Sequence, residues 1–327
     1  MPMKPKMKAV LFYRYGPPEV LQFKEVEMPV PKANEILLKI KAAAVTMGDC
    51  EMRRPEITSF TWFMARLYFG LRKPRIKTLG SYFAGEIESI GSDVKSFKIG
   101  DQLFGISPTF GAHAEYICLS DKYALTKLPS KMSYEEAAPV GLGLDSLHFL
   151  KKAKIKNGEQ ILINGAGGGI GTYAVQLAKY FGATVTAVDS KNKLEMLRTI
   201  GADEVIDFQE GDFTKKGLTY DIVFDVVGSL SHSRSLRLLN KTGRYISAIP
   251  LLSRLFPNLW VSLTSNKKMM TGLTNPHIED LDFLKELIEA DQFKTIIDRS
   301  YELAEVIDAH RYVEQTLKKG NVVISLK

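Results

Sequence analysis

The chain has 327 residues, more than the roughly 250–300 at which one hydrophobic core usually gives way to two, so we expect two domains. Lys and Arg total 44 and Asp and Glu total 37, and the net charge of +7 allows an anionic ligand without indicating nucleic acid. An apolar fraction of 45% and a charged fraction of 25% are ordinary for a globular protein and argue against a disordered chain.

Neither the cysteine content nor the start of the chain indicates export. Cys50 and Cys118 are too few for a disulfide framework or a structural zinc cluster, and a reduced intracellular protein is the default. Residues 1–8 contain lysines but not the apolar core of a signal peptide. No stretch approaches the roughly 20 apolar residues of a spanning helix. We therefore expect a cytoplasmic protein without a membrane span.

Short strands separated by glycine and proline turns make up about the first 125 residues. This pattern is typical of a small β-barrel. The expected strands are Lys8–Tyr13, Val20–Met28, Glu35–Val45, Ala84–Ile90, Gln102–Ile106 and Ala112–Leu119.

Near residue 130 the pattern changes to alternating strands and helices. Ser133 and Glu136 have the spacing of a capping box, which marks the start of a helix. The β-α-β alternation that follows is typical of a parallel, doubly wound sheet. The expected strands are 160–164, 184–188, 204–206, 221–226 and 243–248, with helices at 169–181 and 190–200; the tail is expected to form strands near 267–272 and at 321–326, with helices at 279–290 and 302–318.

Five glycines lie between a predicted buried strand and a predicted helix. They belong to the segment Gly165, Ala166, Gly167, Gly168, Gly169, Ile170 and Gly171. Backbone without side chains can approach a diphosphate closely, and the amino end of the next helix can hold it through free N–H groups and a partial positive charge. The spacing that fits such a turn is Gly165, Gly168 and Gly171, and the strand–loop–helix–strand context favours this interpretation over a plain glycine turn.

Asp189 ends the second predicted strand of this region, 18 residues beyond Gly171. A carboxylate there can accept both ribose hydroxyls of NAD and would repel the 2′-phosphate of NADP. Lys191 and Lys193 follow at once and can offset that repulsion. The alternative is that Asp189 caps the helix that begins near Ser190. We expect NADH to be slightly favoured over NADPH.

Taken together, these residues resemble the medium-chain dehydrogenase/reductase superfamily, and within it the zinc-free quinone oxidoreductase-like branch. The resemblance covers nearly the whole chain. It rests on segments 16–21 (GPPEVL), 79–85 (LGSYFAG), 111–116 (GAHAEY), the glycine loop with 174–178 (AVQLA), 201–203 (GAD) and 221–228 (DIVFDVVG).

The resemblance implies an α/β protein with two domains and a nicotinamide cofactor. Residues 1–130 and 272–327 would form a GroES-like β-barrel catalytic domain, and residues 131–271 a Rossmann domain with a doubly wound parallel sheet. Hydride transfer would take place in the cleft between them. NAD(P)H would be held by the glycine loop together with Asp189, Ser190, Lys193 and Val227.

Zinc-dependent members of the superfamily have zinc ligands at three places where this chain has other residues. The matching positions are Thr46, Ser81 with Tyr82, and approximately Leu142. Thr and Ser are poor zinc ligands and Leu is none. Without a Lewis acid to hold an alkoxide, oxidation of a primary alcohol is disfavoured, whereas quinones and activated C=C bonds are already electrophilic. We therefore expect an enzyme that uses no metal.

The chain also departs from the quinone reductase branch. Where the branch usually has Asn-Pro-x-Asp, residues 46–49 read Thr-Met-Gly-Asp, so that only Asp49 is kept. The branch often has Asp where Tyr82 stands and Thr where Asp145 stands. It also has a Gly-Lys pair where residues 320–321 read Gly-Asn. We expect the substrate pocket and the cofactor contacts to differ from those of better-known members.

Two hydroxyl groups are candidates for catalysis. Tyr82 can donate a proton to an enolate or a hydroquinone anion; the alternative is an aromatic side chain packed at a strand edge. Thr46 can hydrogen-bond the nicotinamide or the acceptor carbonyl; the alternative is an ordinary threonine at the end of a strand. Asp49 is expected to be the N-cap of a helix; the alternative is a polar group on the cleft.

Residues 57–70 and 249–263 are two strongly apolar segments, each with one Arg and each too short to span a bilayer. One interpretation is packing in the core or in a dimer interface. Another is an apolar mouth over the nicotinamide, suited to bulky hydrophobic acceptors. A third is a helix that lies in a membrane interface.

The sequence thus favours an NAD(P)H-dependent reductase of quinones or α,β-unsaturated carbonyl compounds. It would act on a small hydrophobic electron acceptor as a homodimer, without a nucleic-acid partner. The alternatives are a nucleotide-binding regulatory protein without turnover and, less favoured, a zinc-type alcohol dehydrogenase.

Overall fold

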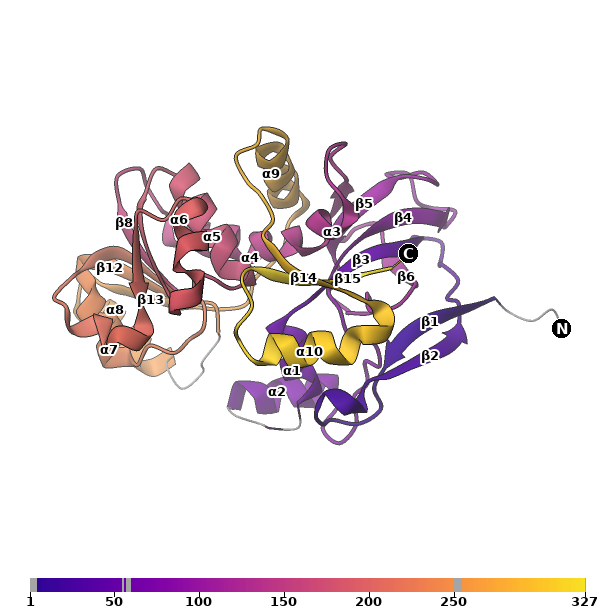
Figure 1. Ribbon diagram of the computed structural model, residues 1–327, viewed down its shortest axis with the longest axis horizontal. Coiled ribbons are helices and arrows are strands. Elements are labelled where there is room, and N and C mark those ends of the chain that lie inside the picture. The colour runs from indigo at the N-terminus through magenta and orange to yellow at the C-terminus, as the bar shows by residue number, and fades with distance from the viewer. Residues whose placement is uncertain (1–4, 55, 57–59, 250–254, 327) are drawn as a thin grey trace.

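The computed structural model describes residues 5–54, 56, 60–249 and 255–326, and within them two large sheets are joined by helices (Figure 1). The middle of the chain forms a six-stranded sheet, and the first part and the end of the chain together form a seven-stranded sheet. This architecture confirms the expected α/β fold, with a GroES-like barrel domain and a Rossmann-like parallel sheet.

The six-stranded sheet is parallel throughout and has the order β10-β9-β8-β11-β12-β13. Its strands are β8 (Gln160–Asn164), β9 (Thr184–Asp189), β10 (Glu204–Asp207), β11 (Tyr220–Asp225), β12 (Leu239–Ser247) and β13 (Lys268–Thr271), and its connecting helices are α5 (Gly169–Tyr180), α6 (Leu194–Thr199), α7 (His232–Leu238) and α8 (Leu255–Thr264). From β8 the chain adds β9 and β10 on one side, and then returns to add β11, β12 and β13 on the other side. The strand order therefore reverses between β8 and β11. In doubly wound sheets, ligands bind in the crevice at the carboxyl ends of the strands at this point.

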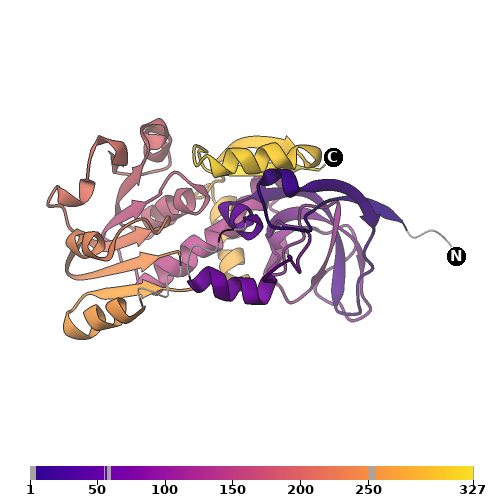
Figure 2. The ribbon, with the colours of Figure 1, turned by 90° about the horizontal axis from the view of Figure 1, so that it is seen from below.

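The seven-stranded sheet has the order β14-β15-β3-β4-β5-β7, with β6 also paired to β3. Its strands are β3 (Glu35–Val45), β4 (Tyr82–Ile90), β5 (Gln102–Ile106), β6 (Tyr116–Ser120), β7 (Leu125–Lys127), β14 (Ile297–Glu302) and β15 (Asn321–Ser325), and a separate hairpin is formed by β1 (Lys6–Leu11) and β2 (Gln22–Glu27). Because β15 pairs antiparallel with β3, the end of the chain returns to the first domain. Figure 2 shows helix α10 (Val306–Glu314) along this part of the molecule.

Helix α4 (Gly141–Ala153) joins the two sheets through one continuous apolar core. Its side chains Leu144, Leu147 and Phe149 belong to the same buried cluster as Ala42 of β3 and Ala84 of β4. The remaining helices are α1 (Met47–Arg53), α2 (Phe60–Phe69), α3 (Tyr134–Ala137) and α9 (Ile278–Glu289).

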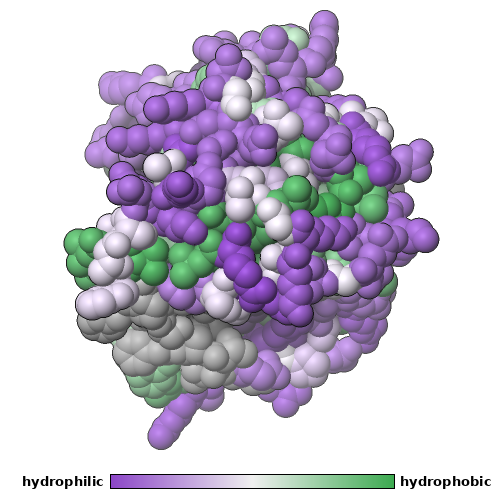
Figure 3. All heavy atoms as spheres, turned by 90° about the vertical axis from the view of Figure 1, so that its left-hand side faces the viewer, coloured by the Kyte–Doolittle hydropathy of each residue, from purple (hydrophilic) through white to green (hydrophobic). Residues whose placement is uncertain are grey.

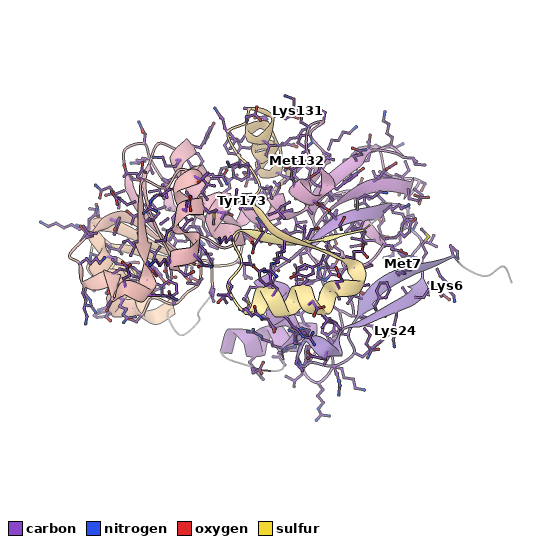
Figure 4. The ribbon with its side chains drawn as sticks, viewed as in Figure 1. Lys6, Met7, Lys24, Lys131, Met132 and Tyr173 are labelled. Carbon is purple, nitrogen blue, oxygen red and sulfur yellow. The ribbon has the colours of Figure 1, made fainter. Side chains whose placement is uncertain are left out.

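A second connection between the two parts of the molecule involves Tyr173 of α5, labelled in Figure 4. Its ring stacks on Phe293 at a centroid distance of 5.0 Å, and its hydroxyl lies 3.0 Å from Thr295 Oγ1. Gln176, one turn further along α5, exchanges hydrogen bonds with the backbone of Lys294. Residues 293–295 lead into β14 of the barrel sheet. These contacts therefore fix helix α5 of the Rossmann-like domain against the start of that strand.

Some element bounds differ from those expected from the sequence. The strand expected at 112–119 begins at Tyr116, and the helix expected at 302–318 ends at Glu314. The helix expected at 190–200 is a 3-10 turn followed by α6. The helix expected at Asp49 is α1, which begins at Met47, and the helix expected after Ser133 is the short α3, followed by α4. Helix α7 and strands β7 and β14 were not expected. Residues 57–59 and 250–254 of the two apolar segments lie outside the described residues; the remainder includes α2 and α8.

Candidate active site

The glycine loop connects β8 to α5 at the point where the strand order reverses. Gly165 has φ of +83°, a left-handed conformation that favours glycine, and its N–H donates to the Val188 carbonyl of β9. Gly168 is the N-cap of α5 and offers no side chain to cap it. The first N–H groups of a helix lack intrahelical partners and, with the helix dipole, attract anions.

The glycines of this loop differ in what a side chain would meet. A Cβ on Gly165 would lie 2.6 Å from Val227 Cγ1, one on Gly167 would lie 2.5 Å from Lys193 Cδ, and one on Gly171 would lie 2.2 Å from the Gly165 oxygen. A Cβ on Gly168 would meet only the Gly165 oxygen, at 3.7 Å. Three of these glycines are thus required by packing, while Gly168 faces open space in front of the helix, where a diphosphate can approach.

Asp189 braces the glycine loop from the end of β9. Its buried carboxylate accepts hydrogen bonds from the N–H groups of Gly167 (2.7 Å) and Ser190 (2.8 Å). The ammonium of Lys193 lies 2.9 Å from the same carboxylate and also donates to the Thr316 carbonyl. Asp189 does not cap the following turn, whose N-cap is Ser190 without a side-chain hydrogen bond. The ion pair with Lys193 offsets the negative charge of Asp189.

Two residues from the end of the chain complete the surroundings of this loop: Lys318, which no sequence pattern indicated, and Asn321, which stood out only as a departure from the branch. Lys318 Nζ would lie 3.7 Å from a Cβ on Gly169, and Asn321 Oδ1 would lie 2.9 Å from it. Burial, followed by the nearby Lys193 ammonium, lowers the pKa of Lys318 to about 8. Among the described residues, buried Asn321 Oδ1 has no hydrogen-bond partner. A cation beside a helix N-terminus fits an anionic cofactor, whereas the free Asn321 oxygen can only accept a hydrogen bond.

Thr46 and Asp49 form a capping box at the start of α1. The Thr46 hydroxyl accepts from the Asp49 N–H and donates to the Asp49 carboxylate, which also accepts from the Thr46 N–H. Thr46 is therefore the N-cap and Asp49 is its partner in the first turn, which corrects the expectation that Asp49 is the N-cap. The second carboxylate oxygen of Asp49 accepts from the Gly80 N–H at 2.8 Å, so the box also fixes the segment that leads to Tyr82.

Tyr82, the first residue of β4, donates its hydroxyl to the carboxylate of Asp145 in α4 at 2.9 Å. Asp145 is only 8% exposed and also accepts a hydrogen bond from the Thr274 side chain. Burial raises the pKa of Asp145, although the hydrogen bonds from Thr274 and Tyr82 act in the opposite direction. Burial and then the Asp145 carboxylate raise the pKa of Tyr82 well above its ordinary value.

Two residues at the start of α4 connect the glycine loop to Tyr82. A Cβ on Gly169 would lie 3.0 Å from Leu142 Cδ1, and a Cβ on Gly141 would lie 2.4 Å from Tyr82 Cδ1. The structure therefore places Asp189, Ser190, Lys193 and Val227 around the glycine loop. Tyr82 is linked to that loop through Gly141 and Leu142. Thr46 is linked to the segment before Tyr82 through Asp49 and Gly80.

A hollow of about 320 Å³ lies at the end of α2 and is mostly apolar. It is lined by Phe69, Arg75, Ile76, Pro108 and Thr109. Its Pro108 and Thr109 follow β5 directly, and the last residue of β5 pairs in register with Tyr82. The hollow is thus adjacent in the fold to the start of β4.

Two features are absent from the described residues. No group of three or more His, Cys, Asp or Glu side chains there is arranged to hold a metal ion. None of the helices there is long and apolar enough to cross a membrane.

A doubly wound sheet with a glycine turn at its switch point, joined to a GroES-like barrel, defines a class: two-domain oxidoreductases that use a dinucleotide. Residues 32–130 match the family model described as alcohol dehydrogenase GroES-like domain, and residues 200–324 match the one described as zinc-binding dehydrogenase. The chain belongs to the medium-chain dehydrogenase/reductase superfamily, in its quinone oxidoreductase-like branch, and is an NAD(P)H-dependent oxidoreductase of that family.

Individual relatives agree with this placement. The chain is 30% identical to 2-methylene-furan-3-one reductase of Solanum lycopersicum, over 98% of this chain and 79% of the relative. It is 31% identical to quinone oxidoreductase of Homo sapiens, over 73% of this chain and 72% of the relative. The solved structure of the quinone oxidoreductase from Coxiella burnetii superimposes with a TM-score of 0.88 at 31% identity, covering 99% of this chain and all of that one.

Proposed function

We propose that this protein is a zinc-independent reductase that transfers a hydride from NADH or NADPH to a quinone or an α,β-unsaturated carbonyl compound. The observation that supports this proposal most is that the residues at the three zinc-ligand positions make other contacts. The Thr46 hydroxyl is bonded to Asp49, the Tyr82 hydroxyl is bonded to Asp145, and Leu142 is an apolar side chain packed beside the glycine loop. The relatives named quinone oxidoreductase and 2-methylene-furan-3-one reductase agree with this class of acceptor.

The cofactor would occupy the front of the glycine loop. Gly168 and the first turn of α5 would hold its diphosphate, with Lys318 as the nearby cation. Asp189 would accept the adenosine ribose hydroxyls, and because Lys193 neutralises its charge, we propose only a slight preference for NADH. Ser190 and Val227 border the same space. Once bound, the nicotinamide supplies the hydride.

The barrel residues would stabilise the negative charge that develops on the acceptor oxygen. A quinone or enone oxyanion is resonance-stabilised, so a hydrogen bond from Tyr82 or Thr46 can replace a Lewis acid. Loss of a preorganised oxyanion contact can lower kcat by about 10²–10³. We expect Tyr82→Phe to cost no more than about tenfold, because water can reach an open cleft and supply the proton.

The acceptor would be small and hydrophobic. The hollow at the end of α2 is mostly apolar, and α2 exposes Phe63, Met64 and Leu67 on its surface. This supports the interpretation of residues 57–70 as an apolar mouth. Pockets of this kind bury a ring system while a few polar groups orient its oxygen.

The deciding experiment is a turnover screen of the purified protein with NADH and NADPH against quinones, enones and aldehydes, with and without a chelator. We expect quinones or enones to be reduced at a rate that chelators leave unchanged. Binding of cofactor without oxidation of it by any acceptor would instead identify a nucleotide-binding regulator. An activity that chelators abolish and added zinc restores would identify a zinc-type dehydrogenase and overturn the proposal.

A further inference from the structure

Two separate departures from the quinone reductase branch are in direct contact in the structure. Tyr82 stands on the barrel strand β4 and Asp145 on α4. The two residues are 63 positions apart, and their side chains hydrogen-bond at 2.9 Å across the junction between the two sheets.

Few charged groups surround this pair. Asp145 accepts hydrogen bonds from the Tyr82 hydroxyl of β4 and from the Thr274 hydroxyl in the segment after β13. Asp49 of α1 is the other acid that acts on Tyr82. The protonation state of Asp145 therefore decides which way the hydrogen bond to Tyr82 runs. An ionised Asp145 accepts a hydrogen bond from the Tyr82 hydroxyl. A protonated Asp145 can instead donate a hydrogen bond to the Tyr82 oxygen.

Tyr82 and Asp145 lie close to the glycine loop, so that their hydrogen bond can act on the proposed reaction. Tyr82 packs on Gly141, and the next residue, Leu142, contacts the first residue of α5 in the glycine loop. Tyr82 is only partly buried, whereas Asp145 behind it is almost inaccessible. We therefore take the more exposed residue, Tyr82, as the outer member of the pair and Asp145 as the inner one.

We propose that Tyr82 and Asp145 form a proton relay for the reduced acceptor, with Tyr82 as the outer donor and Asp145 as the group that restores its proton. The proposal rests on the proposed function, because a quinone or enone that receives a hydride needs one further proton.

The relay balances. The Tyr82 O–H bond breaks and its proton goes to the oxyanion of the reduced acceptor. The Asp145 O–H bond breaks and its proton goes to the Tyr82 oxygen, which leaves the Asp145 carboxylate to take a proton from solvent before the next turnover. An ionised Asp145 holds the Tyr82 proton and cannot return one, so the relay is active only while Asp145 is protonated. The contribution of the relay to the rate must therefore fall as the pH rises through the pKa of Asp145, which burial raises. Because water can also supply the proton, this fall should not exceed the roughly tenfold effect expected for Tyr82→Phe.

The first test is the pH dependence of kcat for quinone or enone reduction. In the wild-type protein we expect a fall on the alkaline side of the Asp145 pKa, and in Asp145→Asn we expect that fall to disappear. Thr274→Val should move the fall to higher pH, because the Thr274 hydrogen bond lowers the pKa of Asp145. The matched control is Asp282→Asn, which removes a partly buried carboxylate of α9 that accepts from Thr126 and should leave the profile unchanged. The same pH profile in wild type and Asp145→Asn would overturn the relay.

The second test needs neither cofactor nor acceptor. In protein labelled with ¹³C at the tyrosine Cζ carbons, the Tyr82 signal is assigned by its loss in Tyr82→Phe. We expect this signal to shift with pH in the wild type as Asp145 ionises, and to lose that shift in Asp145→Asn. Absence of the shift in the wild type would overturn the relay even in an active reductase. Conversely, a protein that reduces no quinone or enone but keeps the shift would contradict the proposed function and leave the coupled pair established.

Discussion

The preference between NADH and NADPH should depend on the carboxylate of Asp189. Replacing it by Ser removes the negative charge opposite the 2′-position and leaves Lys193, buried beside it, free to attract a phosphate. We expect Asp189→Ser to improve the affinity for NADPH relative to NADH by about tenfold, or about 1.4 kcal/mol, as measured by fluorescence titration with both cofactors. Asp203→Asn, which removes a surface partner of Lys179, is the control. Wild-type protein that already binds NADPH about ten times more tightly would show that Asp189 does not contact the ribose.

Lys318 should make cofactor binding depend on pH. Its pKa of about 8 means that the ammonium form, which attracts a diphosphate, predominates below that pH and is lost above it. We expect the wild-type affinity for NADH to fall as the pH rises through about 8. Lys318→Met should remove this pH dependence and weaken binding at pH 7 by about tenfold.

The neighbouring Lys319 is exposed and provides the matched control for this charge. Lys319→Met should keep both the affinity and its pH dependence. If Lys319→Met and Lys318→Met had equal effects, general attraction by the basic surface would explain the binding, and Lys318 would have no specific place at the diphosphate.

At the scale of single residues, the sequence could predict what lies within one stretch of chain. The glycine loop and Asp189 belong to one strand–loop–helix–strand unit, so their proximity follows from spacing. The contact of Asp145 with Tyr82 and the approach of Lys318 to Gly169 join segments that are distant along the chain. No local pattern encodes such pairs. The branch resemblance did single out both Tyr82 and Asp145 as unusual, which is the signal that could have linked them.

The loop before α5 combines glycines needed for packing with one available to a ligand. Gly168 has φ of −89° and ψ of −176°, which any residue can adopt, and its Cβ would point to open space. We expect Gly168→Val to fold with an unchanged melting temperature and to lose cofactor binding, because the branched side chain would occupy the position of the diphosphate. Unchanged NADH affinity in folded Gly168→Val would place the diphosphate elsewhere.

Gly171 is the matched comparison within the same loop. A Cβ there would lie 2.2 Å from the Gly165 oxygen, closer than two atoms can approach, so the backbone of the loop would have to shift. We expect Gly171→Ala to lower the melting temperature, since overpacking of this kind costs about 1–3 kcal/mol. Calorimetry on both variants separates the structural glycine from the one that faces the ligand.

Helix α4 shows why the bounds of some helices could not be predicted. Sequence periodicity reveals a helix when one face is apolar and the other polar. Residues from Gly141 to Leu147 are all buried, because α4 lies between the two sheets and packs against α5 as well. Its polar residues Asp145 and Ser146 are buried too, and so they give no solvent-facing stripe. In contrast, α9 has three buried leucines at helical spacing and was predicted within one residue at each end.

For the whole molecule, the order of barrel, parallel sheet and return to the barrel was predictable. Alternation of strands and helices between 160 and 271 requires a parallel sheet, and the final strand was expected at 321–326. What the sequence could not give is the pairing of β15 with β3, through which Val322 lies opposite Val45. That pairing brings residues 316–321 to the glycine loop, where Gly320 N–H donates to the Gly167 carbonyl. The surroundings of the glycine loop are therefore a product of chain topology.

One end of the molecule has a surface suited to self-association. Strand β13 is an edge strand, paired only with β12 among the described strands, and unpaired sheet edges readily accept another strand. Beside it, α8 exposes Leu259, Trp260 and Leu263, with 57%, 70% and 74% of each side chain accessible. Figure 3 shows apolar surface crossing this end of the molecule. We therefore expect two copies to associate here about a twofold axis, which brings the same surface of each copy together.

The test of this homodimer is the molar mass in solution, measured by light scattering after size-exclusion chromatography. We expect a dimer for the wild type and a monomer for Trp260→Glu, because a buried, unpaired carboxylate in a dimer interface is strongly unfavourable. Phe208→Glu, which alters another exposed aromatic residue (49% accessible) away from α8, should remain dimeric. A monomeric wild type would contradict self-association, and a dimeric Trp260→Glu would move the interface away from α8. Because Trp260 is exposed in the single chain, its replacement should leave the melting temperature of each monomer nearly unchanged, so that loss of the dimer is not confused with loss of the fold.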